Sequence, residues 1–507
     1  MRTTHRGLIA ALALAPLLTG CFAANENTSG AAADGAKRLR VALAVPPVQA
    51  LSPYSNDATV LSKLSVAEGL TKLGKDGNAQ PALAKSWQRV DAKTWTFELR
   101  KASFQDGTQV TAAAVVNALD HAGKAATKPR VLSDVALKAK ADDAGTVRIT
   151  SSTPDPVLPW RLASPALGIL SAKAYAKDGT VSPVGTGTGA FRIAEVAGKT
   201  KARLDRFDGY WGGKAKAAGV DVSWIADGTA RTNALRGGEV DIAEWIPTSQ
   251  AKLLPEGTRH EVPSVRTDSL VLNTGGGVFA DAGMRGAARK AVDGSVLVGS
   301  VFGGYGDAPE GLFGPGVGWA AGARDKQRPA GRAEAASAAE VKEKARSKTL
   351  RLATYTNRAE LPEVASVVQQ QLEKAGFEVE QDVREYTQME ADLLAGKYDA
   401  LVFSRVTLLD TGDAVSYLAS DYASKGVYNI ARLKDPAVDK AIAAAAEEGD
   451  TGERRKKIMA AEAEILRTDA VLPLVHEKVV QGIGTDVTGV LLDPRERSLI
   501  DAGTRLK

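Results

Sequence analysis

The chain has 507 residues, of which 44% are hydrophobic, and a formal net charge of +5 at pH 7. Its length exceeds that of one ordinary domain, so we expect two or more lobes with substantial cores. Lysine and arginine are interspersed with acidic residues and form no basic stripe, which argues against a nucleic-acid-binding protein.

The first residues have the pattern of an export signal. Arg2 and Arg6 precede an apolar run over residues 8–18. This run is shorter than the roughly 20 residues that a membrane-spanning helix needs, but it suits the apolar region of a signal peptide. We therefore expect residues 1–20 to direct export and to be absent from the folded body.

The single cysteine of the chain, Cys21, follows this segment directly. Residues 18–21, LTGC, resemble the lipobox of bacterial lipoproteins, which implies that Cys21 is lipidated and begins the mature chain. A buried free thiol is the alternative, but residues 22–37 lack the apolar periodicity of a core. We expect residues 21–37 to be a lipidated cysteine and a flexible tether, and the exported body to contain no disulfide.

The first half of the chain is predicted to alternate strands and helices. Residues 38–45, RLRVALAV, are typical of a buried strand, and residues 93–100, KTWTFELR, alternate as a half-buried strand does. Thr111 is the expected N-cap of a helix over 111–122. The glycines of 185–196 lead into a strand, whereas a dinucleotide-binding motif needs glycines that open a helix. Nucleotide binding is therefore not expected.

The second half contains a strand-helix-strand-helix-strand pattern. The expected strands cover 350–356, 377–383 and 398–405, and the expected helices cover 360–376 and 389–397. Such alternation predicts an α/β fold with a parallel sheet covered on both faces, and ligands bind at the carboxyl ends of strands in such sheets. The charged, alanine-rich stretch 324–349 is expected to be a surface helix with a solvated linker.

The sequence offers no set of catalytic residues. It lacks a G-x-S-x-G motif, and His121, His260 and His476 lie far apart in the mature chain. Without a second cysteine or closely spaced histidines, a zinc site is not expected either. We predict that the protein is not an enzyme and holds no metal or cofactor.

Several blocks together resemble the dipeptide, oligopeptide and nickel class of solute-binding proteins that serve ABC importers, bacterial solute-binding protein family 5. The blocks, in family order, are 81–119, 184–193, 208–216, 230–242, 270–274 and 283–298. In the first block we expect a helix that ends at Trp87, then an alternating strand, an Asp-Gly turn and a capped helix. The likeness extends from about residue 38 to the end of the chain.

The resemblance implies a bilobed fold like the type II periplasmic binding proteins, in the large dipeptide-binding class. Lobe one would cover 38–275, with an extra subdomain over about 55–180. Lobe two would cover 276–468, and 469–507 would return to lobe one.

The resemblance also implies a function. A lipid-anchored monomer would capture a small peptide or related solute outside the membrane and deliver it to an ABC permease and its ATPase by hinge closure. Alternatives are a binder of nickel, a metal chelate or an opine in the same family, and a ligand sensor or receptor lipoprotein. An extracellular hydrolase is disfavoured, because the sequence shows no nucleophile paired with a base.

In peptide-binding members an aspartate on a lobe-two loop holds the α-ammonium of the peptide. Asp410 in 404–417, SRVTLLDTGDAVSY, matches this acid, and Arg405 matches a basic residue before it. The family's aromatic residue is absent from 407–409. A carboxylate that faces an ammonium in a cleft gives a charge-assisted hydrogen bond worth about 1.5–3 kcal/mol. The alternative for Asp410 is a loop cap that contacts backbone alone.

Nickel-type relatives hold a metal chelate with arginines and aromatic residues. Arg130 lies in a stretch comparable to their chelate-contacting loop, so Arg130 and Arg405 are candidates to hold an anionic chelate. No histidine falls near 404–428, which disfavours direct ligation of a metal.

Three aromatic residues are further candidates to line the cleft by position: Tyr54, Trp245 and Tyr417. Core packing is the alternative for each, since aromatic side chains stabilise proteins mostly by burial. Asn273 and Thr274 lie where the chain is expected to cross between the lobes and are predicted to act at the hinge.

Overall fold

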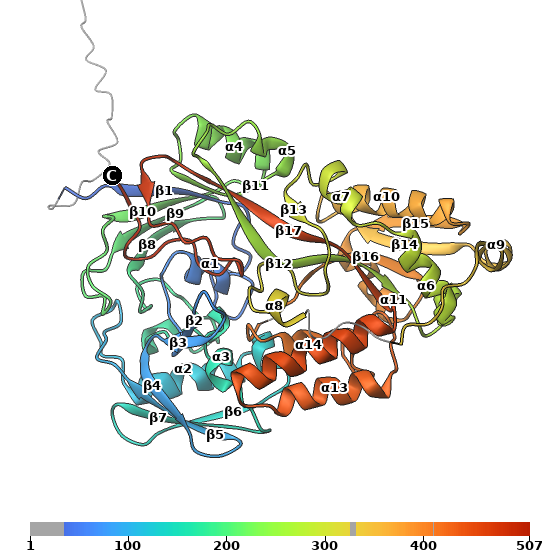
Figure 1. The fold of residues 1–507 in the computed structure, drawn as a ribbon. Helices are drawn as coiled ribbons and strands as arrows, with labels where there is room; N and C mark the ends of the chain where they lie inside the picture. Colours follow the sequence, from blue (N-terminus) through green and yellow to red (C-terminus); the bar gives the residue numbers. More distant parts are fainter. Residues whose placement is uncertain (1–34, 325–330, 409) are drawn as a thin grey trace, which may run out of the picture.

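The computed structural model describes residues 35–324, 331–408 and 410–507. The expected signal peptide and the lipid anchor at Cys21 lie outside these ranges, as does most of the predicted tether. The described chain forms two lobes that are joined by long strands (Figure 1). No helix within these ranges is long and apolar enough to cross a membrane.

Lobe one is built on one half of an 11-stranded sheet, in the order β11-β1-β10-β9-β8. The strands are β1 (Arg38–Leu43), β8 (Phe191–Ala197), β9 (Lys201–Arg206), β10 (Gly219–Trp224) and β11 (Ile242–Ile246), with helices α1 (Ala58–Lys63), α4 (Gly228–Arg236) and α5 (Thr248–Ala251). Strand β1 runs parallel to both β10 and β11. The strand predicted over 38–45 is therefore central, and Val41 and Leu43 are buried in the core of this lobe.

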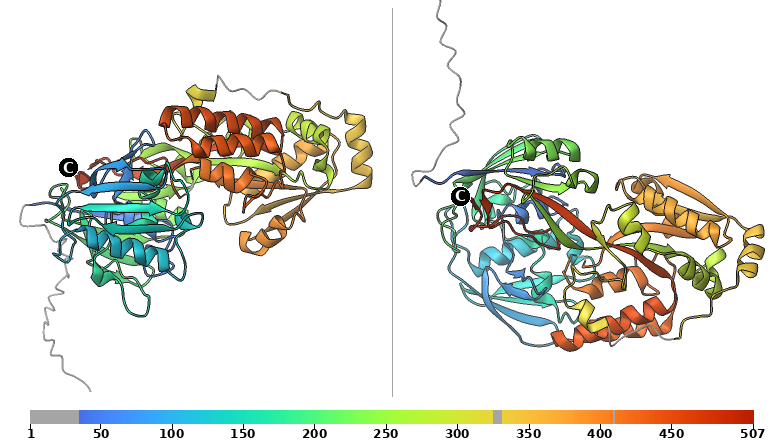
Figure 2. Two further views of the ribbon diagram at one scale, coloured as in Figure 1. Left: turned by 90° about the horizontal axis from the view of Figure 1, so that it is seen from below. Right: turned by 45° about the horizontal axis from the view of Figure 1, so that its top comes forward.

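A subdomain with a core of its own extends from lobe one (Figure 2). Its four-stranded sheet has the order β4-β5-β7-β6. Its elements are β2 (Thr71–Leu73), β3 (Ala79–Pro81), β4 (Ala84–Arg89), β5 (Thr94–Leu99), α2 (Ala112–Lys124), β6 (Leu137–Ala141), β7 (Thr146–Ser151) and α3 (Leu158–Arg161), and the short 3₁₀ helices η1 (Arg130–Leu132), η2 (Pro165–Leu167) and η3 (Ala172–Ala174). Thr111 caps α2 as predicted, because its hydroxyl accepts the backbone N–H of Ala114 at 3.2 Å.

The predicted helix that ends at Trp87 is wrong. Residues Ala84–Arg89 form β4, which pairs with β5 and places Trp87 opposite Phe97. The two rings lie 6.4 Å apart at their centroids. The local preference of this alanine-containing stretch for a helix is overridden by the pairing with β5 and by this cross-strand contact.

Lobe two contains the predicted strand-helix-strand-helix-strand unit. Its strands are β13 (Gly306–Asp307), β14 (Leu350–Tyr355), β15 (Val379–Arg384) and β16 (Ala400–Val406). Its helices are α6 (Ala282–Ala291), α7 (Ser295–Ser300), α8 (Ala320–Arg324), α9 (Ala338–Ser347), α10 (Leu361–Lys374), α11 (Tyr386–Leu394), α12 (Ala414–Tyr422), α13 (Pro436–Glu447) and α14 (Thr451–Arg467), with the 3₁₀ helix η4 (Val278–Ala280). Strand β14 is parallel to β15 and β16, which confirms the predicted parallel sheet.

The lobes are joined by β12 (Arg259–Leu272) and β17 (Val471–Ile483). Strand β12 pairs with β17 along its length and with β16 over 266–272, and β17 pairs with β11 near its end. The large sheet therefore passes through both lobes without a break. The β12–β17 register shifts between Pro263 and Thr267, and this irregularity lies where β12 leaves lobe one.

The last part of the chain, with β18 (Val487–Thr488) and β19 (Arg505–Leu506), lies against lobe one. It also reaches the other units. The carbonyl of Pro494 accepts the N–H of Val265 on β12 at 3.1 Å, and Arg495 donates to the carbonyl of Gly74 in the subdomain at 2.8 Å. The segment thus ties the crossing strands to the subdomain.

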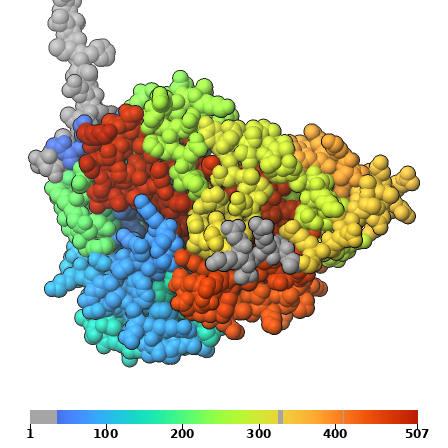
Figure 3. Space-filling view, in the orientation of Figure 1, coloured from blue at the N-terminus to red at the C-terminus, as the bar shows by residue number. Residues whose placement is uncertain are grey.

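Away from the crossing strands, the subdomain touches lobe two. Figure 3 shows the blue subdomain against the orange-red helices of lobe two. Arg455 on α14 donates to the carbonyl of Asp76 at 2.9 Å and to the side-chain oxygen of Asn78 at 3.0 Å, both in the β2–β3 turn. A side-chain contact therefore links the lobes on the side opposite their backbone connection.

Buried polar groups hold the crossing strands together. His476 on β17 is 1% exposed, and its Nδ1 lies 2.9 Å from the hydroxyl of Thr267 on β12. That hydroxyl donates to the carbonyl of Leu312 at 2.8 Å, so Nδ1 of His476 is itself the donor to the Thr267 oxygen. Burial, with the charge of Arg324 nearby, lowers the pKa of His476 to about 4.

The stability of the fold should therefore fall at mildly acidic pH. The folded chain keeps His476 neutral down to its pKa of about 4, whereas the unfolded chain takes up the proton near 6.5. Unfolding free energy should drop by about 1.5 kcal/mol between pH 6.5 and 5 through this residue alone. Urea unfolding at both pH values measures this drop in unfolding free energy, and the drop should be smaller by about this amount in His476→Gln. His260→Gln, at a partly exposed position of β12, should show the same drop as the wild type. If His476→Gln also shows the full drop, the pH dependence does not come from His476.

Candidate functional site

The parallel strands of each lobe end at one edge of its half of the sheet. In lobe two, β14 and β16 are followed by the loops that carry Arg358 and Asp410. In lobe one, β1 and β11 are followed by the loop that carries Tyr54 and by Pro247, with Trp245 near the end of β11. Because ligands bind at the carboxyl ends of strands in such sheets, these loops form the candidate site.

Two predicted site residues from different lobes form an ion pair. Nε of Arg130, in η1 of the subdomain, lies 2.8 Å from Oδ2 of Asp410, and Nη2 lies 3.3 Å from Oδ1. The two side chains are 71% and 30% exposed. The carbonyl of Asp410 also accepts a hydrogen bond from Arg497 of the C-terminal segment at 3.3 Å. Asp410 is thus a point at which both lobes and the C-terminal segment meet.

Arg405 is paired within lobe two. Its guanidinium makes two hydrogen bonds to Asp421, of 2.7 and 2.8 Å, and lies over the ring of Tyr428 at 4.7 Å from the centroid. Burial raises the pKa of Asp421, against the opposing effect of Arg405. Because its charge is matched by a buried carboxylate, Arg405 is not available as a free cation for an anionic ligand.

An aromatic cluster that the sequence analysis did not predict lies beside this pair, with Arg405 over the rings of Phe403 and Tyr428. Phe403 on β16 lies 6.1 Å from Tyr355, 6.3 Å from Tyr386 and 6.0 Å from Tyr428, measured between ring centroids. Tyr355 ends β14 and Tyr386 begins α11, so the rings gather at the carboxyl edge of the lobe-two sheet. Tyr355, near the end of the strand predicted over 350–356, and Tyr386, three residues after the strand predicted over 377–383, were the available sequence signal.

Tyr417 does not line a cleft. Its side chain is 2% exposed, its hydroxyl lies 2.8 Å from that of Tyr422, and its ring packs edge-on against Phe313. The interpretation as a ligand-contacting residue is therefore corrected to core packing. The residue lies on the inner face of α12, where the apolar stripe of the helix packs against the lobe-two core.

Tyr54 is half-buried beside the subdomain core. Burial raises the pKa of its hydroxyl to about 12, and the hydroxyl is hydrogen-bonded to Tyr175. Tyr175 in turn stacks on His121, with 4.1 Å between the centroids. Two exposed apolar side chains precede Tyr54 on the same loop, Val45 and Val48, which are 51% and 57% exposed. This loop presents apolar surface at the end of β1.

Trp245 has a left-handed backbone, with φ of 50°, inside β11. Arg231 donates a hydrogen bond to the carbonyl of Trp245 at 2.6 Å. The ammonium of Lys63 lies 5.1 Å from the centroid of the Trp245 ring and also pairs with the buried carboxylate of Glu244. Non-glycine residues with positive φ are strained and persist where their surroundings hold them. The ring is thus fixed in place near the carboxyl edge of the lobe-one strands.

Asn273 and Thr274 lie within lobe two, at the end of β12. Asn273 donates to the carbonyl of Tyr398 at 2.9 Å, and the Thr274 hydroxyl donates to the carbonyl of Ala431 at 3.1 Å. Both partners belong to lobe two. The strand crosses between the lobes earlier, so these residues anchor the end of β12 and do not lie at the crossing.

The described residues contain no group of three or more histidine, cysteine, aspartate or glutamate side chains placed to hold a metal ion. The charged groups of the site are instead matched in oppositely charged pairs.

Residues 78–429 match the family described as bacterial extracellular solute-binding proteins, family 5 Middle. The chain is 28% identical over 517 residues to the glutathione-binding protein GsiB of Escherichia coli O6:K15:H31, with 97% of each chain covered.

The fold is also shared with solved structures. A nickel ABC transporter protein from Bacillus halodurans has a TM-score of 0.75 at 24% identity, over 92% of this chain and 100% of that one. DppA from Helicobacter pylori in complex with the peptide STSA has a TM-score of 0.72 at 19% identity, over 92% and 98%. These likenesses confirm the predicted bilobed α/β fold.

The contact between Arg130 and Asp410 should favour the closed arrangement of the lobes. Reversing one charge, as Arg130→Asp, should open the lobes, and the double variant Arg130→Asp/Asp410→Arg should restore closure. Because the pair is partly exposed, we expect about 0.5–1 kcal/mol, or a two- to fivefold shift in the ratio of closed to open molecules, at low salt. Distances between spin labels on the two lobes measure this ratio.

The matched control is Arg148→Gln, which breaks an exposed pair with Asp142 inside the subdomain. It should leave the inter-lobe distance unchanged. A double variant as open as the single one would show that Arg130 and Asp410 do not interact across the cleft.

Proposed function

The chain belongs to family 5 of the bacterial extracellular solute-binding proteins, which work with ABC importers, and we propose that its ligand is a small peptide. The similar proteins differ in their solutes: GsiB is named for glutathione, and DppA was solved with a tetrapeptide, STSA. The choice among solutes must come from the charges at this chain's own site. As solute-binding proteins, members capture ligands and do not catalyse reactions.

The observation that carries the proposal is the pair of Arg130 and Asp410. A small peptide with free ends has an ammonium at one end and a carboxylate at the other. Inserted between the two side chains, it would place its ammonium on Asp410 and its carboxylate on Arg130, so that every charge stays paired. The exposed Arg130 can move aside without leaving a buried charge alone.

An anionic metal chelate fits this pair less well. It could bind Arg130, but its own negative charge would then lie beside the Asp410 carboxylate. Arg405 offers no second cation, because Asp421 occupies its guanidinium. We propose that Arg405 instead fixes the position of Tyr428 and the aromatic cluster, and that these rings contact the side chains of the peptide.

Delivery requires that the ligand select the closed form. A ligand shifts the balance of open and closed molecules only by its differential affinity for the two. A peptide that touches Asp410 in lobe two and Arg130 in the subdomain makes both contacts in the closed form alone. Closure would then mark the loaded protein for the permease and its ATPase.

We propose that the chain acts as a monomer held at the outer face of the cytoplasmic membrane by a lipid on Cys21. The support is the LTGC motif after a short apolar segment. Two or more acyl chains anchor a protein stably, so the rest of the chain needs no membrane-spanning helix.

A thermal-shift screen tests the ligand class. One arm holds di- to pentapeptides and glutathione, and the other holds nickel with small chelators. A ligand at about 100 times its dissociation constant should stabilise the folded protein by about 2.7 kcal/mol. We expect a peptide to stabilise the folded protein. Asp410→Asn should weaken the binding of that peptide by about tenfold or more.

Arg148→Gln should bind the peptide as the wild type does. Stabilisation by chelates alone, unaffected by Asp410→Asn, would reject the peptide proposal and move the assignment to the metal-chelate branch.

Cellular fractionation tests the anchor. Cys21→Ser should abolish incorporation of labelled palmitate and move the protein from the membrane fraction or leave it as an uncleaved precursor. Thr28→Ala, seven residues along the predicted tether, should do neither. Labelling that persists in Cys21→Ser would contradict the proposal.

A further inference from the structure

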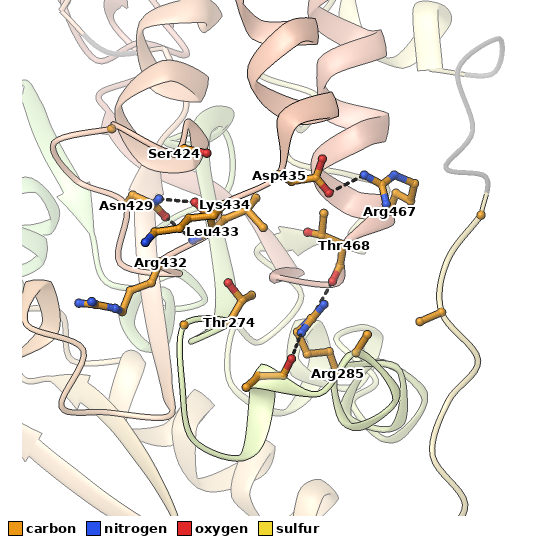
Figure 4. Close-up of a pocket in the computed structure, with 16 residues that line it drawn as sticks. Thr274, Arg285, Ser424, Asn429, Arg432, Leu433, Lys434, Asp435, Arg467 and Thr468 are labelled. Atoms are coloured by element: carbon orange, nitrogen blue, oxygen red, sulfur yellow. Dashed lines mark hydrogen bonds and ion pairs between the residues drawn. The ribbon is translucent and has the colours of Figure 1, made fainter.

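A hollow of about 620 Å³ lies in lobe two, at the edge opposite the candidate peptide site (Figure 4). It is bounded by the end of β12 with Thr274, the start of α6, the loop 424–435 and the end of α14. Leu272 on β12 pairs with Ala400, the first residue of β16, whereas Asp410 follows the last. The length of β16 therefore separates the two sites.

The lining of this hollow has an excess of positive charge. Four cationic side chains line it: Arg285, Arg432, Lys434 and Arg467. The acid among its lining residues, Asp435, is already paired with Arg467 at 2.7 Å. Arg285, Arg432 and Lys434 form no ion pair with any acid in the described part of the chain.

Arg432 is held in a fixed position. Its backbone is left-handed, with φ of 51°, which is strained for a residue other than glycine. Its side chain runs over two glycines that leave it room. A Cβ on Gly275 would lie 3.0 Å from the Arg432 Cβ, and one on Gly396 would lie 2.6 Å from its Cδ. Its Nη1 donates to the carbonyl of Leu394 at 3.2 Å, which leaves further N–H groups to bind a ligand.

Arg285 is fixed by carbonyl groups. Nε donates to the carbonyl of Thr468 at 2.8 Å, and Nη1 donates to the carbonyls of Phe279 at 2.8 Å and Ala280 at 3.1 Å. Carbonyls orient a guanidinium but do not neutralise it, and the carboxylates of Asp469 and Asp281 act on Arg285 electrostatically without forming an ion pair with it. In Figure 4 the side chain of Arg285 lies in the lower part of the view and that of Lys434 lies above it.

We propose that this hollow binds a small oxyanion of the phosphate class, as a second site separate from the peptide site. Guanidinium groups donate two hydrogen bonds to one oxyanion and an ammonium adds a mobile charge, which together suit phosphate. The volume lies in the range of small-molecule sites. The inference does not rest on the peptide proposal.

A neighbouring hollow of about 750 Å³ has the opposite character. Four acids line it, Asp281, Glu334, Glu340 and Glu343, with Lys344 as its cation. Asp281 and Ala282 are adjacent in the chain and line the two hollows in turn. An anion that approaches this end of lobe two is therefore repelled by one hollow and attracted by the other.

Calorimetric titration of the mature chain with inorganic phosphate tests the proposal, at pH 8 and at ionic strength held constant with chloride. We expect one saturable site. Arg432→Gln/Lys434→Gln should weaken phosphate binding by about tenfold or more, and Lys434→Gln alone, an exposed change, by severalfold. The matched control, Lys374→Gln/Lys440→Gln, removes two exposed charges elsewhere on lobe two and should bind within about twofold of the wild type.

Arg130→Gln, at the peptide site, should also leave phosphate binding unchanged, and the double variant should still bind peptide. A titration without saturation would overturn the proposal. So would an equal loss in the site and control variants, because it would show general attraction to a cationic surface.

Discussion

The arrangement of this protein depends on two strands that belong to both lobes. Strands β12 and β17 pair with each other and with the sheets on either side, so one sheet runs from β15 to β8. Where they cross, Asp268 and Glu477 are buried together, and Ser404 and Arg358 bond to Glu477. Burial and the adjacent Glu477 raise the pKa of Asp268. The hydrogen bonds that buried Glu477 accepts from Ser404 and Arg358 restrict how the strands can shift.

Because the backbone links the lobes along one line, side chains alone hold them together elsewhere. The contacts of Arg130 with Asp410 and of Arg455 with the β2–β3 turn are both on this side. A partly exposed ion pair is worth little in free energy, so a ligand can replace it and shift the lobes. A rigid crossing and a weak opposing contact are what reversible capture requires. The cationic hollow lies outside this moving part, within lobe two.

Local patterns predicted the local structure well. The period of the apolar residues located β14, α10, β15, α11 and β16, and Thr111 was identified as a cap from its position before a helical repeat. Contacts distant in the sequence were not predictable in the same way. Any of many acids could have paired with Arg130, and its place beside Asp410 follows from how the subdomain packs. Tyr417 was misread because an aromatic residue after a loop looks the same in sequence whether it faces a cleft or a core.

The most direct test of the account is a calorimetric comparison of a short peptide with its N-acetylated form, in the wild type and in Asp410→Asn. If Asp410 holds the ammonium, acetylation should weaken binding to the wild type by about tenfold or more and should have little further effect in the variant. An equal loss on acetylation in both proteins would show that the ammonium lies elsewhere. That result would contradict a bound peptide that bridges the lobes through Asp410.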